Sequence, residues 1–165
     1  MALKLKKLYE DTQQTIYLDM DGVLTNFVKA FENTAGYPPK DSSFGDNDSV
    51  YTVLQQVSEE FWSKMAWMPD GKELWNYVKN LNVVICSTPI DNNACRVGKR
   101  KWCRDNLGAQ VKVILIDKKE EYANENSILI DDHEKVINKW INAGGIGILH
   151  KNTKDTIKQL KKILS

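Results

Sequence analysis

Short apolar runs alternate with amphipathic stretches along most of the chain. The runs predict buried strands, because each is rich in aliphatic or β-branched residues and bounded by polar ones; they cover residues 15–18, 83–86, 111–116, 127–130 and 146–149. The stretches between them repeat apolar residues at helical spacing; they cover residues 74–78, 92–106, 134–143 and 153–164. This alternation predicts an α/β fold, a five-stranded parallel sheet with helices on both faces.

The alternation is interrupted between the first strand and residue 71. Helical spacing appears at 26–34 and 50–57 and again from Ser58, and the loop between the first two segments is dense in turn-forming residues. We therefore predict a small helical cap, residues 26–70, inserted into a core domain made of residues 1–25 and 71–165.

Composition narrows the class of protein. Lysine plus arginine (23) nearly cancel aspartate plus glutamate (22), so bulk charge favours neither a nucleic-acid partner nor a membrane surface. No apolar run reaches the length of a membrane span. The three cysteines lack metal-binding spacing and are interpreted as reduced thiols, which favours a cytoplasmic location.

Each predicted strand is followed by polar residues that can bind ligands or take part in catalysis. The carboxyl ends of parallel strands share one edge of a sheet, where ligands bind. The residues expected there are Asp19 and Asp21, Ser87 and Thr88, Asp117 to Lys119, Asp131 to His133, and His150 and Lys151. Paired carboxylates are suited to a hard divalent cation, and lysine and hydroxyl donors beside them are suited to a phosphoryl group. The chain has neither a P-loop nor a dinucleotide-binding glycine motif.

The same residues resemble the motifs of the haloacid-dehalogenase-like (HAD) phosphohydrolases. Asp19-Met20-Asp21-Gly22-Val23-Leu24-Thr25 resembles their first motif, Val84 to Pro89 the second, and Ile128 to Asp132 the fourth, in the same order along the whole chain. Cys86-Ser87-Thr88-Pro89 and Leu129-Ile130-Asp131-Asp132 are most similar to the 5'(3')-deoxyribonucleotidases of compact bacterial and phage type. The third motif is a lysine; Lys119 is favoured, with Lys118 as the alternative.

The resemblance implies a Rossmann-like HAD fold and a magnesium-dependent hydrolase of nucleoside monophosphates. Asp19 would be the nucleophile that forms an aspartyl-phosphate, and Asp21 the general acid and base. Asp19, Asp21 and Asp132 would ligate Mg²⁺, with Asp131 orienting them or exchanging roles with Asp132. Ser87 and Thr88 would bind the phosphate, and Lys119 would balance its charge.

Two further features stay open at the level of sequence. The cap is rich in aromatic residues, of which Phe44 and Trp67 are candidates for stacking on a nucleobase or for ordinary packing. The basic triplet Lys99-Arg100-Lys101 within a predicted helix is interpreted as a solvated face, with contact to a nucleotide or a polynucleotide end as the alternative.

Other functions remain as alternatives. Within the HAD phosphatases, the substrate could be a sugar phosphate or a polynucleotide end. A phosphoacceptor receiver domain also has five strands, and it would use Asp117 after the third strand and Lys151 after the fifth.

Overall fold

The computed structural model describes residues 14–39 and 48–165. Its elements, in chain order, are β1 (Thr15–Leu18), α2 (Phe27–Ala35), α3 (Asp48–Gln56), α4 (Glu59–Ser63), α5 (Gly71–Val78), β2 (Val83–Ser87), α6 (Asn93–Leu107), β3 (Lys112–Leu115), the 3₁₀ helix η1 (Lys119–Tyr122), β4 (Ser127–Asp131), α7 (Glu134–Asn142), β5 (Ile146–Leu149) and α8 (Thr153–Ile163).

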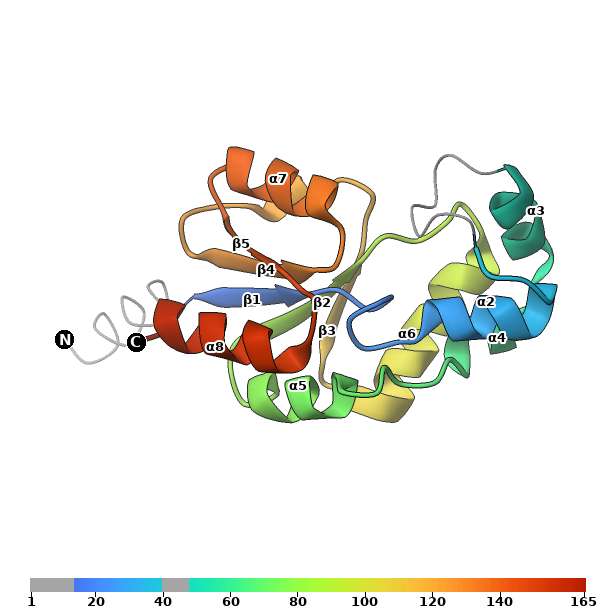
Figure 1. Ribbon diagram of the computed structural model, residues 1–165, viewed down its shortest axis with the longest axis horizontal. Coiled ribbons are helices and arrows are strands. Elements are labelled where there is room, and N and C mark those ends of the chain that lie inside the picture. Colours follow the sequence, from blue (N-terminus) through green and yellow to red (C-terminus); the bar gives the residue numbers. More distant parts are fainter. Residues whose placement is uncertain (1–13, 40–47) are drawn as a thin grey trace.

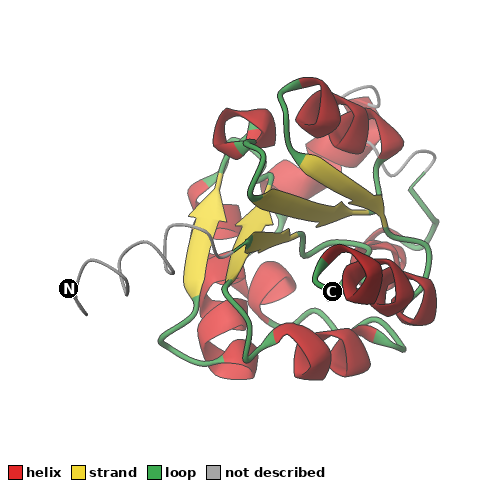
Figure 2. Cartoon of the chain, turned by 90° about the vertical axis from the view of Figure 1, so that its left-hand side faces the viewer, coloured by secondary structure: helices red, strands yellow, loops and turns green. Residues whose placement is uncertain are grey.

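The predicted five-stranded parallel sheet is confirmed, with strand order β3-β2-β1-β4-β5. One face is covered by α7 and the other by α5 and α8, as Figures 1 and 2 show. Alternate residues of β1 account for this division, because side chains along a strand point to opposite faces. Ile16 and Leu18 join the larger core, whereas Tyr17 packs on Trp140 of α7, with ring centroids 5.1 Å apart.

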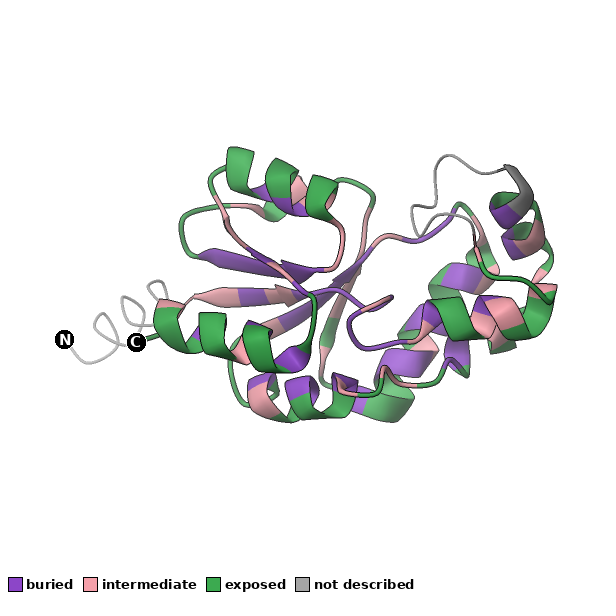
Figure 3. Ribbon diagram, in the orientation of Figure 1, coloured by how far each residue is buried: buried purple, intermediate pink, exposed green. Residues whose placement is uncertain are grey.

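Helices α2, α3 and α4 lie together beyond one end of the sheet (Figure 1). Two connecting segments join them to the sheet, and these segments pair through the Asn26 N–H to the Ala66 carbonyl (2.8 Å) and the Met68 N–H to the Leu24 carbonyl (2.7 Å). Apolar residues of α2 and α4 belong to the same buried cluster as those of the sheet. Figure 3 shows buried residues both in the sheet and in these helices. The division into core and cap therefore stays a prediction.

The segment between β3 and β4 carries the two candidates for the third-motif lysine. Its residues 119–122 form the turn of η1. This turn carries the Lys119 side chain inward, leaving it 3% exposed. Among the described residues, no helix has the length and apolarity needed to cross a membrane.

Candidate active site

Asp19 and Asp21 lie where β1 ends at the carboxyl edge of the sheet. The Asp19 N–H still donates to the carbonyl of Ile130 in β4 (3.0 Å), so the backbone of Asp19 is fixed at the junction of two central strands. Gly22 then turns the chain with a φ of 79°, a left-handed conformation that favours glycine. Both carboxylates are buried, and burial raises the pKa of Asp19 to about 7, against the opposing effect of Lys119.

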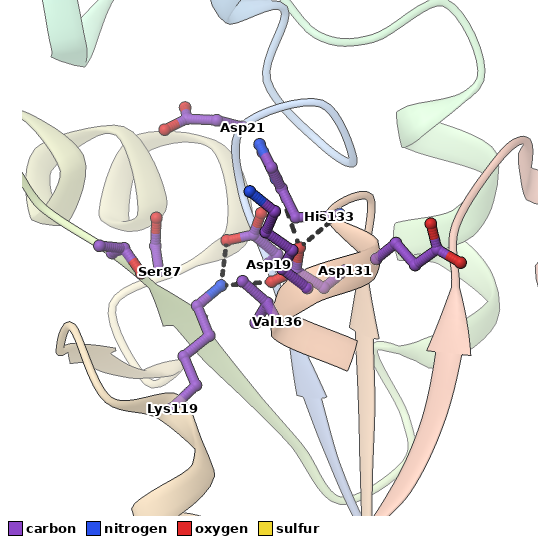
Figure 4. A pocket seen from close by; sticks show the side chains of 10 residues that line it. Asp19, Asp21, Ser87, Lys119, Asp131, His133 and Val136 are labelled. Carbon is purple, nitrogen blue, oxygen red and sulfur yellow. Dashed lines mark hydrogen bonds and ion pairs between the residues drawn. The ribbon is translucent and has the colours of Figure 1, made fainter. Parts of the chain in front are cut away.

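Lys119 joins the ends of β1 and β4. Its Nζ lies 2.7 Å from Asp19 Oδ1 and 2.7 Å from Asp131 Oδ2, as Figure 4 shows. Burial acts to lower the pKa of Lys119, but the two aspartates outweigh it and hold that pKa above its usual range. Lys118 is exposed, so Lys119 is the lysine that the fold brings to the carboxylates.

A second buried lysine joins β1 to β2. The Lys99 side chain is fully buried, and its Nζ lies 2.6 Å from Asp21 Oδ2, 2.8 Å from Ser87 Oγ and 3.1 Å from the Thr88 carbonyl oxygen. The Thr25 hydroxyl donates to the other Asp21 oxygen (2.8 Å). Both oxygens of the Asp21 carboxylate are thereby held.

The interpretation of Lys99 as part of a solvated face was wrong. In the helical register, Lys99 follows Cys95 by four residues and precedes Trp102 and Cys103 by three and four, which places it on the buried stripe of α6. That register was the signal that could have identified it. Arg100, by contrast, is exposed, and its guanidinium donates to the Val113 carbonyl (3.0 Å).

Asp131 and Asp132, the acidic pair at the end of β4, differ in burial and in contacts. Asp131 is buried and accepts from Lys119 and from the His133 backbone N–H (2.8 Å). Burial would raise its pKa, but the bonds from His133 and Lys119 prevail and lower it to about 2. Asp132 is partly exposed, and its Oδ1 lies 2.9 Å from His133 Nδ1. Hydrogen bonding to Asp131 and Asp132 raises the pKa of His133 to about 11.

A cavity of about 410 Å³ lies among several of these side chains, at the carboxyl edge of the sheet (Figure 4). It is lined by Asp19, Asp21, Ser87, Thr88, Lys119, Asp131, His133, Glu134, Lys135 and Val136. A second cavity of about 230 Å³ adjoins it, since Asp21 and His133 line both. Asp132 lines the second cavity, so the structure gathers the predicted residues of all three matched motifs.

Of the two predicted base contacts, the structure describes Trp67 alone. Trp67 packs on Trp102 with ring centroids 4.8 Å apart, and its Nε1 donates to Asn106 (3.2 Å), so its contacts are those of packing against α6. Phe44 lies outside the described residues. The receiver alternative needed Asp117 and Lys151 at the site, but both are exposed and neither is among the lining residues.

The donor set fits a hard divalent cation. Among the described residues, the ion pairs of the site join four carboxylates to two lysines and one histidine, which leaves an excess of oxygen ligands of the kind Mg²⁺ prefers. The Asp132 carboxylate lies close against the turn at Gly22. A Cβ added at Gly22 would lie only 2.1 Å from Asp132 Oδ2. A side chain there would displace the carboxylate, so Gly22 allows it to approach the backbone beside Asp21.

Among the comparisons with known proteins, the solved structures identify the fold. No protein-family model matches the chain, and neither does any curated protein. A HAD-superfamily hydrolase of subfamily IA from Geobacter sulfurreducens aligns over 90% of this chain and 97% of its own, at TM-score 0.53 and 14% identity. A HAD-superfamily hydrolase from Ehrlichia chaffeensis aligns over 93% and 99%, at TM-score 0.54 and 14% identity.

The chain has the fold of the HAD-superfamily hydrolases. A HAD family hydrolase from Deinococcus radiodurans, solved with bound phosphate and sodium, shares this fold over 85% of the present chain and 82% of its own, at TM-score 0.53 and 12% identity. Identities this low establish the HAD fold alone. The roles of the individual residues therefore rest on their geometry.

Proposed function

We propose that the protein is a magnesium-dependent phosphomonoester hydrolase, specifically a 5'(3')-deoxyribonucleotidase. The observation that carries the proposal is the convergence of Asp19, Lys119 and Asp131 within hydrogen-bond distance at one end of the sheet. The HAD fold supports it, as does the phosphate reported in the structurally similar Deinococcus protein.

Asp19 is suited to act as the nucleophile. Its carboxylate attacks phosphorus and forms an aspartyl-phosphate as the bond to the leaving alkoxide breaks, so one difficult displacement becomes two easier ones. Lys119 holds one oxygen of Asp19 and so presents the carboxylate in a single orientation. It also balances the negative charge that gathers on the phosphoryl oxygens in the transition state.

Asp21 is suited to protonate the leaving alkoxide and then to accept a proton from the water that hydrolyses the aspartyl-phosphate. Lys99 and Thr25 fix its carboxylate from two sides. Lys99 also donates to Ser87 Oγ, which directs the hydroxyl hydrogen of Ser87 elsewhere, toward a phosphate oxygen in the cavity. Lys99 is thus a component of the phosphate site that sequence analysis missed.

Asp19, the Asp21 carbonyl and Asp132 would hold the divalent ion, with Asp131 orienting the set. When bound, the ion neutralises charge between the carboxylate nucleophile and the phosphate. The substrate, a (deoxy)nucleoside monophosphate, is proposed from the motif resemblance. The cavity volume is of the size typical of small-molecule sites. Phe27, Val28 and Met68 give the adjoining cavity an apolar wall on which a base could pack.

The proposal is tested by measuring phosphate release with Mg²⁺ from deoxyribo- and ribonucleoside monophosphates, sugar phosphates and phosphorylated oligonucleotides. We expect preferential turnover of deoxyribonucleoside monophosphates. Asp19→Asn should abolish turnover of every substrate while retaining the fold, as judged by circular dichroism. Equal turnover of sugar phosphates would overturn the nucleotidase assignment alone, whereas activity retained by Asp19→Asn would overturn the mechanism.

A further inference from the structure

The carboxylate of Asp132 is confined from two sides. One oxygen, Oδ1, lies 2.9 Å from His133 Nδ1. The other, Oδ2, faces the turn at Gly22, where even a methyl group would collide with it. The histidine therefore holds one oxygen while the other lies beside the backbone of the first motif.

Asp131 and Asp132 share the His133 imidazole but differ in their other partners. The Nδ1 of His133 lies 3.6 Å from Asp131 Oδ1 and 2.9 Å from Asp132 Oδ1. Both Asp131 oxygens accept hydrogen bonds, one from Lys119 and one from the His133 backbone. Neither lysine of the site forms an ion pair with Asp132, and its side chain is 25% exposed. Asp132 is thus the acid of the pair that is available to a cation, and His133 is the side chain that limits its rotation.

We propose that His133 is a positioning residue for the divalent cation, acting through Asp132. This inference rests on the proposed function. By donating Nδ1–H to Oδ1, the imidazole fixes the carboxylate and leaves Oδ2, beside Gly22, as the oxygen that would bind the cation. The backbone bond from His133 to Asp131 anchors the histidine itself, so one residue organises both acids. Such outer partners typically contribute about 10–100-fold in metal affinity.

The test compares isosteric substitutions of His133. Asparagine places an amide N–H near the position of Nδ1, glutamine places one near Nε2, and leucine offers no donor. Isothermal titration of the full chain with Mg²⁺ should show His133→Leu and His133→Gln binding about 10–100-fold more weakly than wild type. His133→Asn should bind close to the wild-type value. Asn138→Leu, at an exposed position of α7 that lines neither cavity, is the control and should leave the affinity unchanged.

Each other outcome overturns a defined claim. Equal affinity of wild type and His133→Leu, or His133→Asn binding as weakly as His133→Leu, would overturn the positioning role. If His133→Leu fails to fold, the comparison of asparagine with glutamine still decides. An imidazole nitrogen coupling in the electron spin echo spectrum of the Mn²⁺-loaded wild type, at the strength of a direct ligand, would also overturn it. Absence of Mg²⁺ binding by the wild type would instead overturn the proposed function.

Discussion

At the scale of single residues, the site is organised by two buried lysines. Lys119 joins Asp19 to Asp131, and Lys99 joins Asp21 to Ser87. An ammonium group is costly to bury, so each lysine depends on its carboxylate partner and each carboxylate on its lysine. The Nζ of Lys99 also lies 5.5 Å from the centroid of the Trp62 ring, and this cation–π contact further stabilises the buried ammonium group.

Lys99 and Lys101 provide a matched comparison within one helix. Lys99→Met leaves Asp21 without its cation, so we expect a loss of about 3–5 kcal/mol in the free energy of unfolding. Lys101 pairs with Asp105 at an exposed position, so Lys101→Met should cost less than about 1 kcal/mol. Urea denaturation measures both. Similar stabilities of the two variants would contradict the buried ion pair.

Phosphate release provides the second measurement on Lys99. The assay is run at a reduced temperature, to keep the destabilised Lys99→Met variant folded. Its kcat/KM should be about 10²-fold or more below that of wild type, because the donor to Ser87 and the partner of Asp21 are lost together. Lys101→Met should retain wild-type turnover, since Lys101 pairs with an exposed residue of its own helix.

The three cysteines should be inert in the folded protein. Burial raises the pKa of Cys86 and of Cys103 to about 12 and raises that of Cys95 as well, so at neutral pH each remains a thiol. Because the thiolate is the reactive form, we expect no reaction with Ellman's reagent until unfolding, when three thiols per chain should be titrated. Rapid labelling of the native protein would show that a thiol is accessible.

At the scale of elements, α6 packs against helix α4 and against strand β3 of the sheet. Asn92 caps its first turn by accepting from the Ala94 N–H (2.7 Å). Further along, Gly98 lets α4 approach closely, and Trp102 donates to the Met65 carbonyl (2.8 Å). The same helix carries Lys99 to Asp21, so its packing against α4 determines where that ammonium group lies.

Gly98→Ala tests this packing. Alanine would favour the helix by about 1 kcal/mol, but its Cβ would lie 2.5 Å from Trp62 Cβ and 2.6 Å from the Glu59 carbonyl oxygen. Because one of these atoms is backbone, we expect overpacking to prevail, with a net loss of about 1–3 kcal/mol in unfolding free energy. Val97→Ala, at an exposed position, should change stability by less than about 0.5 kcal/mol. If Gly98→Ala were more stable than wild type, α4 would have to shift away from α6 to accommodate the added methyl group.

At the scale of the whole molecule, strand order accounts for the location of the site. β2 and β3 lie to one side of β1, and β4 and β5 to the other, so the order reverses between β1 and β4. Ligands bind at such a switch point in open α/β sheets. Leu18 is paired in register with Ile130, which places Asp19 and Asp131 side by side at the strand ends.

Stability of the whole chain should depend on pH through His150, which follows β5. Its ring is buried, with Nδ1 2.8 Å from Thr156 Oγ1, and burial lowers its pKa below the ordinary value of 6.5. As the pH falls, the imidazole of His150 is therefore protonated in the unfolded chain at a higher pH than in the folded chain. The contribution of His150 to stability is lost as the pH falls below about 6.5.

The measurement is urea denaturation of wild type and His150→Asn at several values of pH. Asparagine does not titrate, so the stability advantage of the wild type should shrink as the pH falls through this range. His133 and Asp19 titrate in both proteins, so their effects cancel in the difference. A difference independent of pH would contradict a buried, neutral His150.

Periodicity predicted the strands and their parallel arrangement, because burial on both faces demands continuous apolar runs whatever the details of packing. The polar residues after those runs marked the edge where Asp19, Ser87 and Asp131 meet, since the carboxyl ends of parallel strands must lie together. These features follow from spacing along the chain, so they were determined by the sequence alone.

Other features depended on which surfaces face one another. Lys99 lies on the buried stripe of α6, but only the approach of Asp21 and Ser87 allows a charge there. The choice between Lys118 and Lys119 required the turn of η1, and Trp67 required its contacts with α6. Tertiary structure decided these cases, because the energy of a charged or aromatic side chain is set by its partners in space, and spacing along the chain does not specify them.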